Sequence, residues 1–595
     1  MIEDKRVPGQ SQDPSDGCGS CKYAAGEDGS SLGHSCKTPR HSGVRRFLYA
    51  ISAPLKCCCF YLFLMQVCTD NILGTGSHGI SDLFNIIALS SLISYFESAV
   101  TMAVGRIAKR VCGLHHAFLN PAFLLFVFVN NLLLLADCFA LTNFGRVIDI
   151  GMLDIVAQTD SREIGEFMDT YLNIKQISLG LLILIFVNGL GWLISRLTWN
   201  CRRILAVLAG LCICWGVVVS GICIYRFARY RNALGIPQLT SLTRVAYYGY
   251  NVHNINSGLE RLTDVAASYS PGTPEEGASI IFVIGESHSV FHSPLYGYGR
   301  NTAPLMNRHA EDGSLVVFSD AVTAYDYTLG VMGSLFSIGG IGDDIYSEPM
   351  FPMVFRHAGY HTALYDNQFF VNQGLGFITS EQLSLAMFDY RNPHFYSYDG
   401  DMIDNMKPMS DRKSLIIIHL LGQHYTYADR YPHTSRFMQF MPGDYDGNEE
   451  ERQSKADYDN ACLYNDYVLD RIVEMAGDGN VCMVYVSDHG EDVFEQPGVV
   501  GHGNAAYLPT LRYQIRVPMF IWASKKFRES NPDVWSAVEN AASRPVITDD
   551  ISHLLMDIAR LDVPELDRTR SVISPEYDAD KPRVVLSSVT YSSDR

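Results

Sequence analysis

The chain has 595 residues, 47% of them hydrophobic, and a formal net charge of -18 at pH 7. This length allows several domains, and the negative charge excludes general nucleic-acid binding, which requires a basic surface. Most of the long apolar stretches precede residue 227. The sequence therefore predicts a membrane domain followed by a domain in water.

Residues 1–46 are rich in Gly, Ser, Asp and Lys and contain few large apolar side chains. Such a segment cannot bury a core, so we expect a disordered cytoplasmic tail. Cys18, Cys21, His34 and Cys36 have a spacing that zinc can use, but no second CxxC pair accompanies them. The flexible tail is therefore favoured over a zinc site.

Five apolar stretches follow within a predicted membrane domain at 47–226, and each is long enough to cross about 30 Å of hydrocarbon. The first is the weakest, because Pro54 and Lys56 interrupt it. A cleaved signal peptide is not expected, since a long polar segment precedes the first stretch. The predicted spans are 47–68, 82–104, 118–141, 177–197 and 204–225.

Lys and Arg residues in the short loops set the orientation of these spans. They lie before span one, after span two and between spans four and five, which the positive-inside rule assigns to the cytoplasm. Five crossings then export the region after residue 227, which in a bacterium enters the periplasm. Of 15 cysteines only Cys462 and Cys482 lie in this region, so no disulfide framework is expected.

A linker is predicted at 227–277 and an α/β domain at 278–595. The apolar, β-branched run 280–284 is typical of a strand buried on both faces of a parallel sheet. A similar run occurs at 481–486, and helix-like segments separate the strand candidates, which favours a mostly parallel sheet. The other strand candidates are 315–318, 361–365, 415–419 and 518–522.

Polar residues follow the two strongest strand candidates directly. Glu286 comes after the first strand, and Asp488 and His489 come after the second. Ligands of parallel sheets bind beyond the carboxyl ends of the strands, where these side chains would meet. Two carboxylates and an imidazole suit a divalent metal such as zinc.

Thr328 precedes small and apolar residues that can begin a helix, which makes it a candidate N-cap. The N–H groups of that helix would face a bound phosphate. A hydroxyl coordinated to a metal there can lose its proton and attack phosphorus. From the residues alone, a capping threonine without a catalytic role is the commoner alternative.

Gly285-Glu286-Ser287 with the segment 295–304 resembles the opening motif of the bacterial phosphoethanolamine transferases, members of the alkaline phosphatase and sulfatase superfamily. The resemblance implies five transmembrane helices before a periplasmic α/β/α domain, and so a multi-pass protein of the bacterial inner membrane. Further similar segments follow in the family's order, at 419–424, 430–432, 458–460, 487–491 and 501–503.

The resemblance implies zinc ligands at Glu286, Thr328, Asp488 and His489, with Thr328 as the residue that becomes phosphoethanolaminated. Ile155 replaces an Asn of the helix that binds the headgroup of the lipid donor, and an ordinary interfacial helix is the alternative there. The implied contacts are His424 and His502 at the transferred phosphate or at a second zinc, and Thr159 and Glu163 at the headgroup. His419 is a further candidate for binding the substrate.

The implied reaction moves phosphoethanolamine from phosphatidylethanolamine to a core heptose, a lipid A phosphate or a periplasmic glucan, and a monomer among membrane lipids is expected. Ala324 and Tyr325 lie where lipid A-modifying members have a cysteine, and 366–368 lacks their nearby lysine. Both differences favour the members of the family that modify core heptose or periplasmic glucans. The identity of the acceptor is not determined by these residues.

Three alternative functions compete with transfer of phosphoethanolamine. A sulfatase needs Cys- or Ser-x-Pro-x-Arg, which is absent at Thr328. A phosphoglycerol transferase, which has a similar topology, or another membrane-anchored hydrolase of the sulfatase superfamily stays the alternative function. A non-enzymatic envelope protein is disfavoured, because a decayed enzyme would be expected to lose some of the ligands.

Overall fold

The structure is a computed structural model, and it places part of the chain well enough to describe. The described residues are 80–112, 120–144, 148, 174–196, 202–230, 255–273, 276–368, 377–407, 412–503, 508–586 and 589–591.

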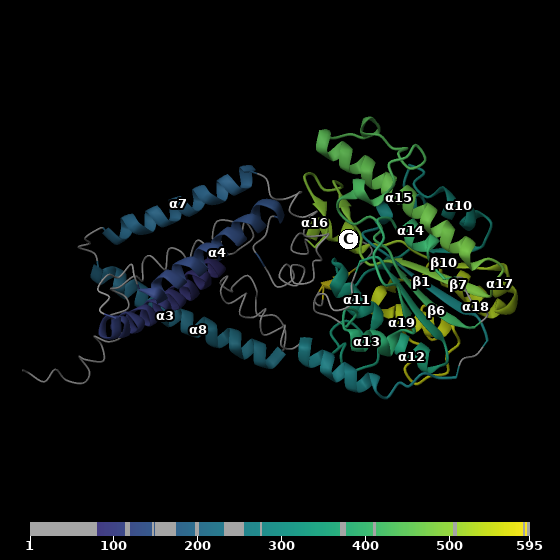
Figure 1. Cartoon of the computed structure of the whole chain (residues 1–595), viewed down its shortest axis with the longest axis horizontal. Coiled ribbons are helices and arrows are strands. Elements are labelled where there is room, and N and C mark those ends of the chain that lie inside the picture. The colour runs from purple at the N-terminus through teal and green to yellow at the C-terminus, as the bar shows by residue number, and fades with distance from the viewer. Residues whose placement is uncertain are drawn as a thin grey trace, which may run out of the picture. The chain divides into compact units, whose positions relative to one another are not determined.

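Four long helices lie where spans two to five were predicted: α3 (Ile80–Cys112), α4 (Pro121–Phe144), α7 (Ile174–Arg196) and α8 (Arg202–Tyr230) (Figure 1). Among the described residues, two stretches are long and apolar enough to cross a membrane, Ile87–Ile107 and Pro121–Ala140. The first predicted span, 47–68, lies outside the described residues. The count of five spans therefore stays a prediction.

The four helices contact one another through small clusters of buried apolar side chains, and many of their large apolar side chains are exposed. Leu89 of α3 packs against Val219 of α8, and Leu134 of α4 packs against Val187 of α7. Large side chains such as Phe128 and others on all four helices are exposed. Exposed apolar surface of this extent is typical of contact with lipid.

The second part is built on a seven-stranded sheet with the strand order β2-β10-β7-β1-β6-β4-β5. The strands pair in parallel except β10, which is antiparallel to both β7 and β2. The predicted mostly parallel sheet is therefore confirmed. The strands are β1 (Ser279–Gly285), β2 (Leu315–Phe318), β4 (His361–Asp366), β5 (Tyr390–Arg391), β6 (Ser414–His419), β7 (Val481–Ser487) and β10 (Met519–Ala523).

Strand β1 lies at the centre of the sheet, and its residues 280–284 are fully buried. Its neighbours are β6 and β7, both parallel, with Gly285 opposite Ser487 and Ile284 opposite His419. This register brings the carboxyl ends of the three central strands to one edge. The residues that follow them therefore meet there, as the sequence predicted.

Helices cover both faces of the sheet (Figure 1). Because side chains alternate along a strand, Phe282 packs on one face with a core that includes Phe336, whereas Val283 packs on the other with Ile472. The first face holds α11 (Thr328–Phe336), α12 (Phe351–His357), α13 (Glu381–Met387) and α19 (Ile551–Ile558), and the second α10 (Pro304–Glu311), α14 (Asp399–Asp404) and α15 (Glu449–Ala476).

Smaller elements complete this part. Within the predicted linker, residues 255–266 form a helix whose Leu262 is fully buried in the same core as β1. The short strands pair as β3 (Ala321–Val322) with β11 (Val546–Ile547), β8 (Asp492–Val493) with β9 (Val500–Gly501), and β12 (Arg583–Val585) with β13 (Val589–Tyr591), and the other helices are α16 (Leu508–Ile515), α17 (Lys525–Ser530) and α18 (Pro532–Ala541).

Candidate active site

Glu286 lies in a tight turn at the carboxyl end of β1 and is fully buried. The next residue, Ser287, has a φ of 55°, in the left-handed region that non-glycine residues seldom adopt. This conformation is held by two hydrogen bonds, from the Ser287 N–H to Asp488 Oδ1 (3.1 Å) and from the Tyr458 hydroxyl to the Ser287 carbonyl (2.5 Å). The turn is therefore fixed from both sides.

The segment after β6 packs directly on this turn. Gly422 has a φ of 49°, and a Cβ there would lie 2.7 Å from the carbonyl oxygen of Glu286. The N–H of Gln423 donates to that same oxygen at 3.0 Å. A glycine at 422 is thus needed for the close approach of the two chains.

Asp488 and His489 follow β7 and lie beside Glu286. The Nε2 atom of His489 is 3.3 Å from Asp488 Oδ2 and 3.4 Å from Glu286 Oε1. Its Nδ1 atom is 2.9 Å from the carbonyl oxygen of Gly490 and therefore donates to it, which leaves the Nε2 lone pair available to a metal. One ligand atom from each of the three side chains lies within 4.8 Å of the others.

The electrostatics of this group favour a bound cation. Burial and, next, the charge of Glu286 raise the pKa of Asp488 to about 7. Burial also opposes the ionisation of Glu286. In the metal-free protein the charge and hydrogen bond of His489, together with the charges of His424 and His502, outweigh burial and hold the pKa of Glu286 well below its usual value. A metal bound at His489 Nε2 would take the place of the proton on that nitrogen. Asp488 Oδ2 is buried without a hydrogen-bond partner. A divalent metal ligated by this oxygen would satisfy it, so the three residues fit zinc.

Thr328 is the first residue of α11, not its N-cap as predicted. Tyr327, with extended backbone angles, occupies the cap position, and no side chain caps the helix. The Thr328 hydroxyl lies instead 3.2 Å from Glu286 Oε2 and 3.3 Å from His489 Nε2. The Thr328 hydroxyl therefore lies both beside the candidate metal ligands and at the N-terminus of α11.

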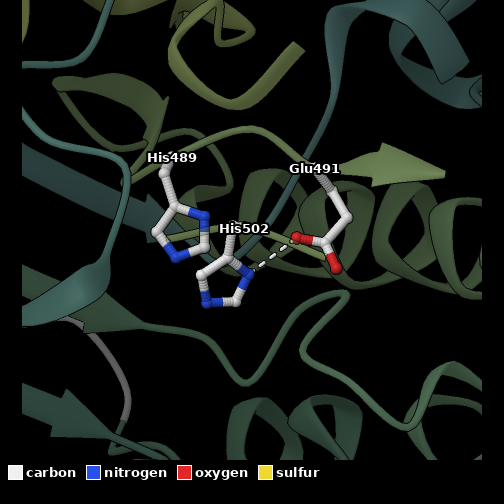
Figure 2. A group of neighbouring side chains, drawn as sticks. All are labelled: His489, Glu491 and His502. Atoms are coloured by element: carbon white, nitrogen blue, oxygen red, sulfur yellow. Dashed lines mark hydrogen bonds and ion pairs between the residues drawn. The ribbon is translucent and has the colours of Figure 1, made fainter. Parts of the chain in front are cut away.

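His502 lies beside His489, with ring centroids 3.9 Å apart, and both labelled rings are seen in Figure 2. Glu491 fixes His502, because its Oε2 is 2.7 Å from His502 Nδ1. The other carboxylate oxygen accepts a hydrogen bond from the Tyr427 hydroxyl at 2.5 Å. His489, Glu491 and His502 also form a group of possible metal ligands. Glu491 was missed as a site residue, although it follows His489 by two positions in the same post-strand segment.

The other two predicted histidines lie at the same edge in different settings. His424 is partly buried in the turn after β6, and its Nδ1 is 2.7 Å from the carbonyl oxygen of Tyr425. His419, the last residue of β6, is fully buried and 3.1 Å from Asp366. Burial lowers the pKa of His419, but the hydrogen bond and charge of Asp366 raise it overall.

The structure therefore brings together most of the predicted site residues, whose roles stay predictions. Glu286, Asp488, His489 and Thr328 form one group, and His502 adjoins it. Thr159 and Glu163, predicted to bind the lipid headgroup, lie outside the described residues. Sequence reasoning also missed Gln368, whose side chain reaches Glu286 from the end of β4.

Residues 278–561 match the Sulfatase family model. The α/β part of the chain is therefore a sulfatase-family domain. Its candidate metal ligands, Glu286, Asp488 and His489, lie where the central strands end.

The homologues of the chain are phosphoethanolamine transferases, which confirms the resemblance drawn from the motifs. The chain is 30% identical over 368 residues to phosphoethanolamine transferase EptC of Escherichia coli strain K12, covering 57% of this chain and 59% of EptC. It is 26% identical over 479 residues to phosphoethanolamine transferase CptA of Salmonella typhimurium, covering 73% of this chain and 79% of CptA. The aligned region thus spans less than two thirds of EptC.

Solved structures extend the likeness beyond the sulfatase-family domain. The integral membrane protein lipooligosaccharide phosphoethanolamine transferase A (EptA) from Neisseria meningitidis has a TM-score of 0.56 at 17% identity, over 87% of this chain and 98% of EptA. This likeness shows that the chain shares the fold of EptA, and it covers the helical part as well as the sulfatase-family domain. The zinc complex of the C-terminal periplasmic domain of E. coli EptC has a TM-score of 0.46 at 27% identity, over 55% of this chain and 93% of that domain.

Proposed function

We propose that this chain is a zinc-dependent phosphoethanolamine transferase of the bacterial inner membrane, with its catalytic domain in the periplasm. It would move phosphoethanolamine from phosphatidylethanolamine to a lipopolysaccharide or glucan acceptor. The observation that carries the proposal is the Thr328 hydroxyl, which lies 3.2 Å from Glu286 and 3.3 Å from His489 at a helix N-terminus. The similarity to the phosphoethanolamine transferases EptC and CptA supports phosphoethanolamine as the group that is transferred.

Zinc would be held by Glu286, Asp488, His489 and the oxygen of Thr328. Bound there, it lowers the pKa of a coordinated hydroxyl, as zinc does for bound water. The fit is supported by Asp488 Oδ2, which is buried without a hydrogen-bond partner, and by the Nδ1 hydrogen bond of His489, which turns Nε2 toward the carboxylates. The zinc complex of the EptC domain is consistent with this choice of metal.

The reaction is a two-step displacement at phosphorus. Thr328 Oγ1 loses its proton and bonds to the phosphorus of the donor, and the bond from phosphorus to the diacylglycerol oxygen breaks. That oxygen takes a proton, and diacylglycerol leaves. An acceptor hydroxyl or phosphate then attacks the same phosphorus, the bond to Thr328 breaks, and the threonine recovers a proton. Donor and acceptor use one site in turn, so the kinetics are ping-pong.

His502 is suited to move the protons of both steps. Its Nδ1 contacts Glu491 at 2.7 Å, so Nε2 is the nitrogen that would exchange protons with the reacting groups. His424, at the same edge, would contact the phosphate oxygens. The N–H groups at the start of α11 add further stabilisation for the charge on phosphorus.

The membrane location is supported by two observations. Four long helices occupy predicted spans two to five, and the fold likeness to EptA covers 87% of the chain. A lipid donor such as phosphatidylethanolamine requires a site near the membrane surface, where Thr159 and Glu163 would bind its ammonium group. The acceptor belongs to the cell envelope.

The donor test uses full-length protein in detergent with zinc. Micelles receive phosphatidylethanolamine carrying a labelled diacylglycerol, and in parallel phosphatidylglycerol with the same label. We expect diacylglycerol release from phosphatidylethanolamine only, abolished by a chelator and restored by zinc. Release from phosphatidylglycerol alone would instead make the protein a phosphoglycerol transferase. Release from neither lipid would contradict the proposed function.

A further inference from the structure

The carboxylate of Glu286 has hydrogen-bonding neighbours on both of its oxygens. Near Oε1 lie the Ser287 hydroxyl, which donates at 2.8 Å, and His489 Nε2 at 3.4 Å. Near Oε2 lie the Gln368 amide, which donates at 3.0 Å, and the Thr328 hydroxyl at 3.2 Å. The carboxylate is fully buried, so these groups replace the water that would otherwise solvate it.

These four neighbours fall into two pairs with different chemistry. Thr328 and His489 offer atoms that the proposed function turns toward zinc. His489 Nε2 would give its lone pair to the metal and the Thr328 hydroxyl would lose its proton, so neither would then donate to Glu286. Ser287 and Gln368 are not needed as ligands. With zinc bound, they are the two donors that stay on the carboxylate, one on each oxygen.

Gln368 is held rigidly from three directions. Its amide nitrogen also donates to the carbonyl oxygen of Leu420 at 2.6 Å, in the turn after β6. Its backbone N–H donates to Asp366 Oδ1 at 2.9 Å. The residue is only 4% exposed. It therefore ties the ends of β4 and β6 to the ligand that follows β1.

Ser287 is equally constrained from the other side of the carboxylate. Its left-handed backbone is fixed by Asp488 and by Tyr458, as described above, and its side chain is fully buried. Ser287 thereby contacts two of the predicted metal ligands at once, Glu286 through its hydroxyl and Asp488 through its N–H. A change at Ser287 or at Gln368 removes one of the two lasting contacts that orient Glu286.

We propose that Ser287 and Gln368 are positioning residues that clamp the Glu286 carboxylate, and that the zinc affinity of the site depends on both. The inference rests on the proposed function, since it takes zinc as the metal. Groups that hydrogen-bond to metal ligands typically contribute about 10- to 100-fold in metal affinity. Loss of either donor also leaves a buried carboxylate oxygen poorly satisfied in the metal-free protein.

The test compares Gln368→Met with Gln423→Met in the full-length protein. Methionine has nearly the shape of glutamine but no N–H donor. Gln423 is a matched control, because it is fully buried at the same edge and its side-chain amide has no hydrogen-bond partner, Glu286 included, among the described residues. Zinc affinity is measured by competition with a chromophoric chelator, without any lipid substrate.

We expect Gln368→Met to weaken zinc binding by about 10-fold or more, with Gln423→Met within about threefold of wild type. The visible spectrum of the Co2+-substituted protein should change in Gln368→Met and not in Gln423→Met, because the orientation of a ligand alters the metal geometry. Melting temperatures of the metal-free variants report folding separately. Equal zinc affinities and equal cobalt spectra for the two variants would overturn the inference.

A second pair decides the matter if Gln368→Met fails to fold. Ser287→Ala removes the other donor, and Ser289→Ala is its control, since the Ser289 hydroxyl accepts from the N–H of Phe291. The same difference in zinc affinity is expected, and its absence would overturn the inference. Wild-type protein that binds no zinc would overturn the proposed function and this inference together. If wild-type protein binds zinc and releases diacylglycerol but the variants bind zinc as their controls do, only the positioning role of Ser287 and Gln368 is rejected.

Discussion

Three buried side chains, Glu286, Asp488 and His489, carry the chemistry of the site at the scale of single residues. Two fully buried carboxylates beside one imidazole are an unfavourable group unless a cation joins them. Each side chain comes from the end of a central strand, so none can move away without disturbing the sheet. The group is therefore preorganised for a metal.

Loss of any one of these side chains should reduce the metal content. Glu286→Ala, Asp488→Ala and His489→Ala each remove one of about four ligands, which opens the site. We expect each purified variant to hold much less zinc than wild type by elemental analysis, with transfer activity lost in parallel. Full zinc occupancy in all three variants would show that the metal binds elsewhere.

Thr328 should behave as a nucleophile and not as a packing residue. Thr328→Ala should lower the release of diacylglycerol by on the order of 10⁶-fold, the cost of removing the nucleophile of a covalent enzyme. Thr328→Ser keeps an oxygen nucleophile at the same place and should retain measurable turnover. Release of diacylglycerol by Thr328→Ala at near the wild-type rate would make water the nucleophile.

The ends of the buried strands could be predicted from the sequence, because buried parallel strands are apolar and end abruptly in polar residues. This pattern sufficed to place Glu286, Asp488 and His489 together. Glu491 and Gln368 could not be found in the same way, since their roles depend on contacts between distant segments. The order of the strands in the sheet was not predicted, since it depends on pairing between distant segments. The N-cap at Thr328 was wrong because the extended backbone of Tyr327 takes that position.

At the scale of elements, a buried ionic cluster joins the segment after β1 to α15 and to the loop after β7. His292 lies 2.5 Å from Asp459 in α15 and 2.8 Å from Glu495. Burial lowers the pKa of His292, but the charge of Asp459 and the two hydrogen bonds raise it to about 10. A charged His292 therefore helps to hold these three elements around the active site.

This cluster predicts how stability depends on pH. The folded pKa of His292 lies above the unfolded value of about 6.5, so its contribution is complete below that pH and is lost toward about pH 10. His292→Gln should be less stable than wild type near pH 6.5, and the difference should shrink as the pH rises, by at most about 1.4 kcal/mol per pH unit. Apparent melting temperatures across this range measure it. A difference that stays constant with pH would contradict the assignment.

At the scale of the whole molecule, the chain combines a helical part with a sulfatase-family domain. The hydrophobic stretches were visible in the sequence because lipid requires long apolar helices. Four of the five predicted spans coincide with helices, whereas the segments that connect them lack the regular pattern needed for prediction. Thr159 and Glu163 fall in such a segment, and their predicted role rests on the resemblance alone.

The orientation of the chain can be tested with reporter fusions after Arg595. Alkaline phosphatase is active only outside the cytoplasm and β-galactosidase only inside it. Five spans starting from a cytoplasmic tail predict an active phosphatase fusion and an inactive galactosidase fusion in a bacterial host. The opposite pattern would place the sulfatase-family domain in the cytoplasm and reject the five-span arrangement.

The most direct test of the central claim is mass spectrometry of the full-length protein after incubation with phosphatidylethanolamine and zinc, without an acceptor. The first displacement should then stop at the covalent stage, and peptide mapping should find one phosphoethanolamine group on Thr328, absent from Thr328→Ala. Diacylglycerol release with no modified Thr328 at any time point would contradict the account.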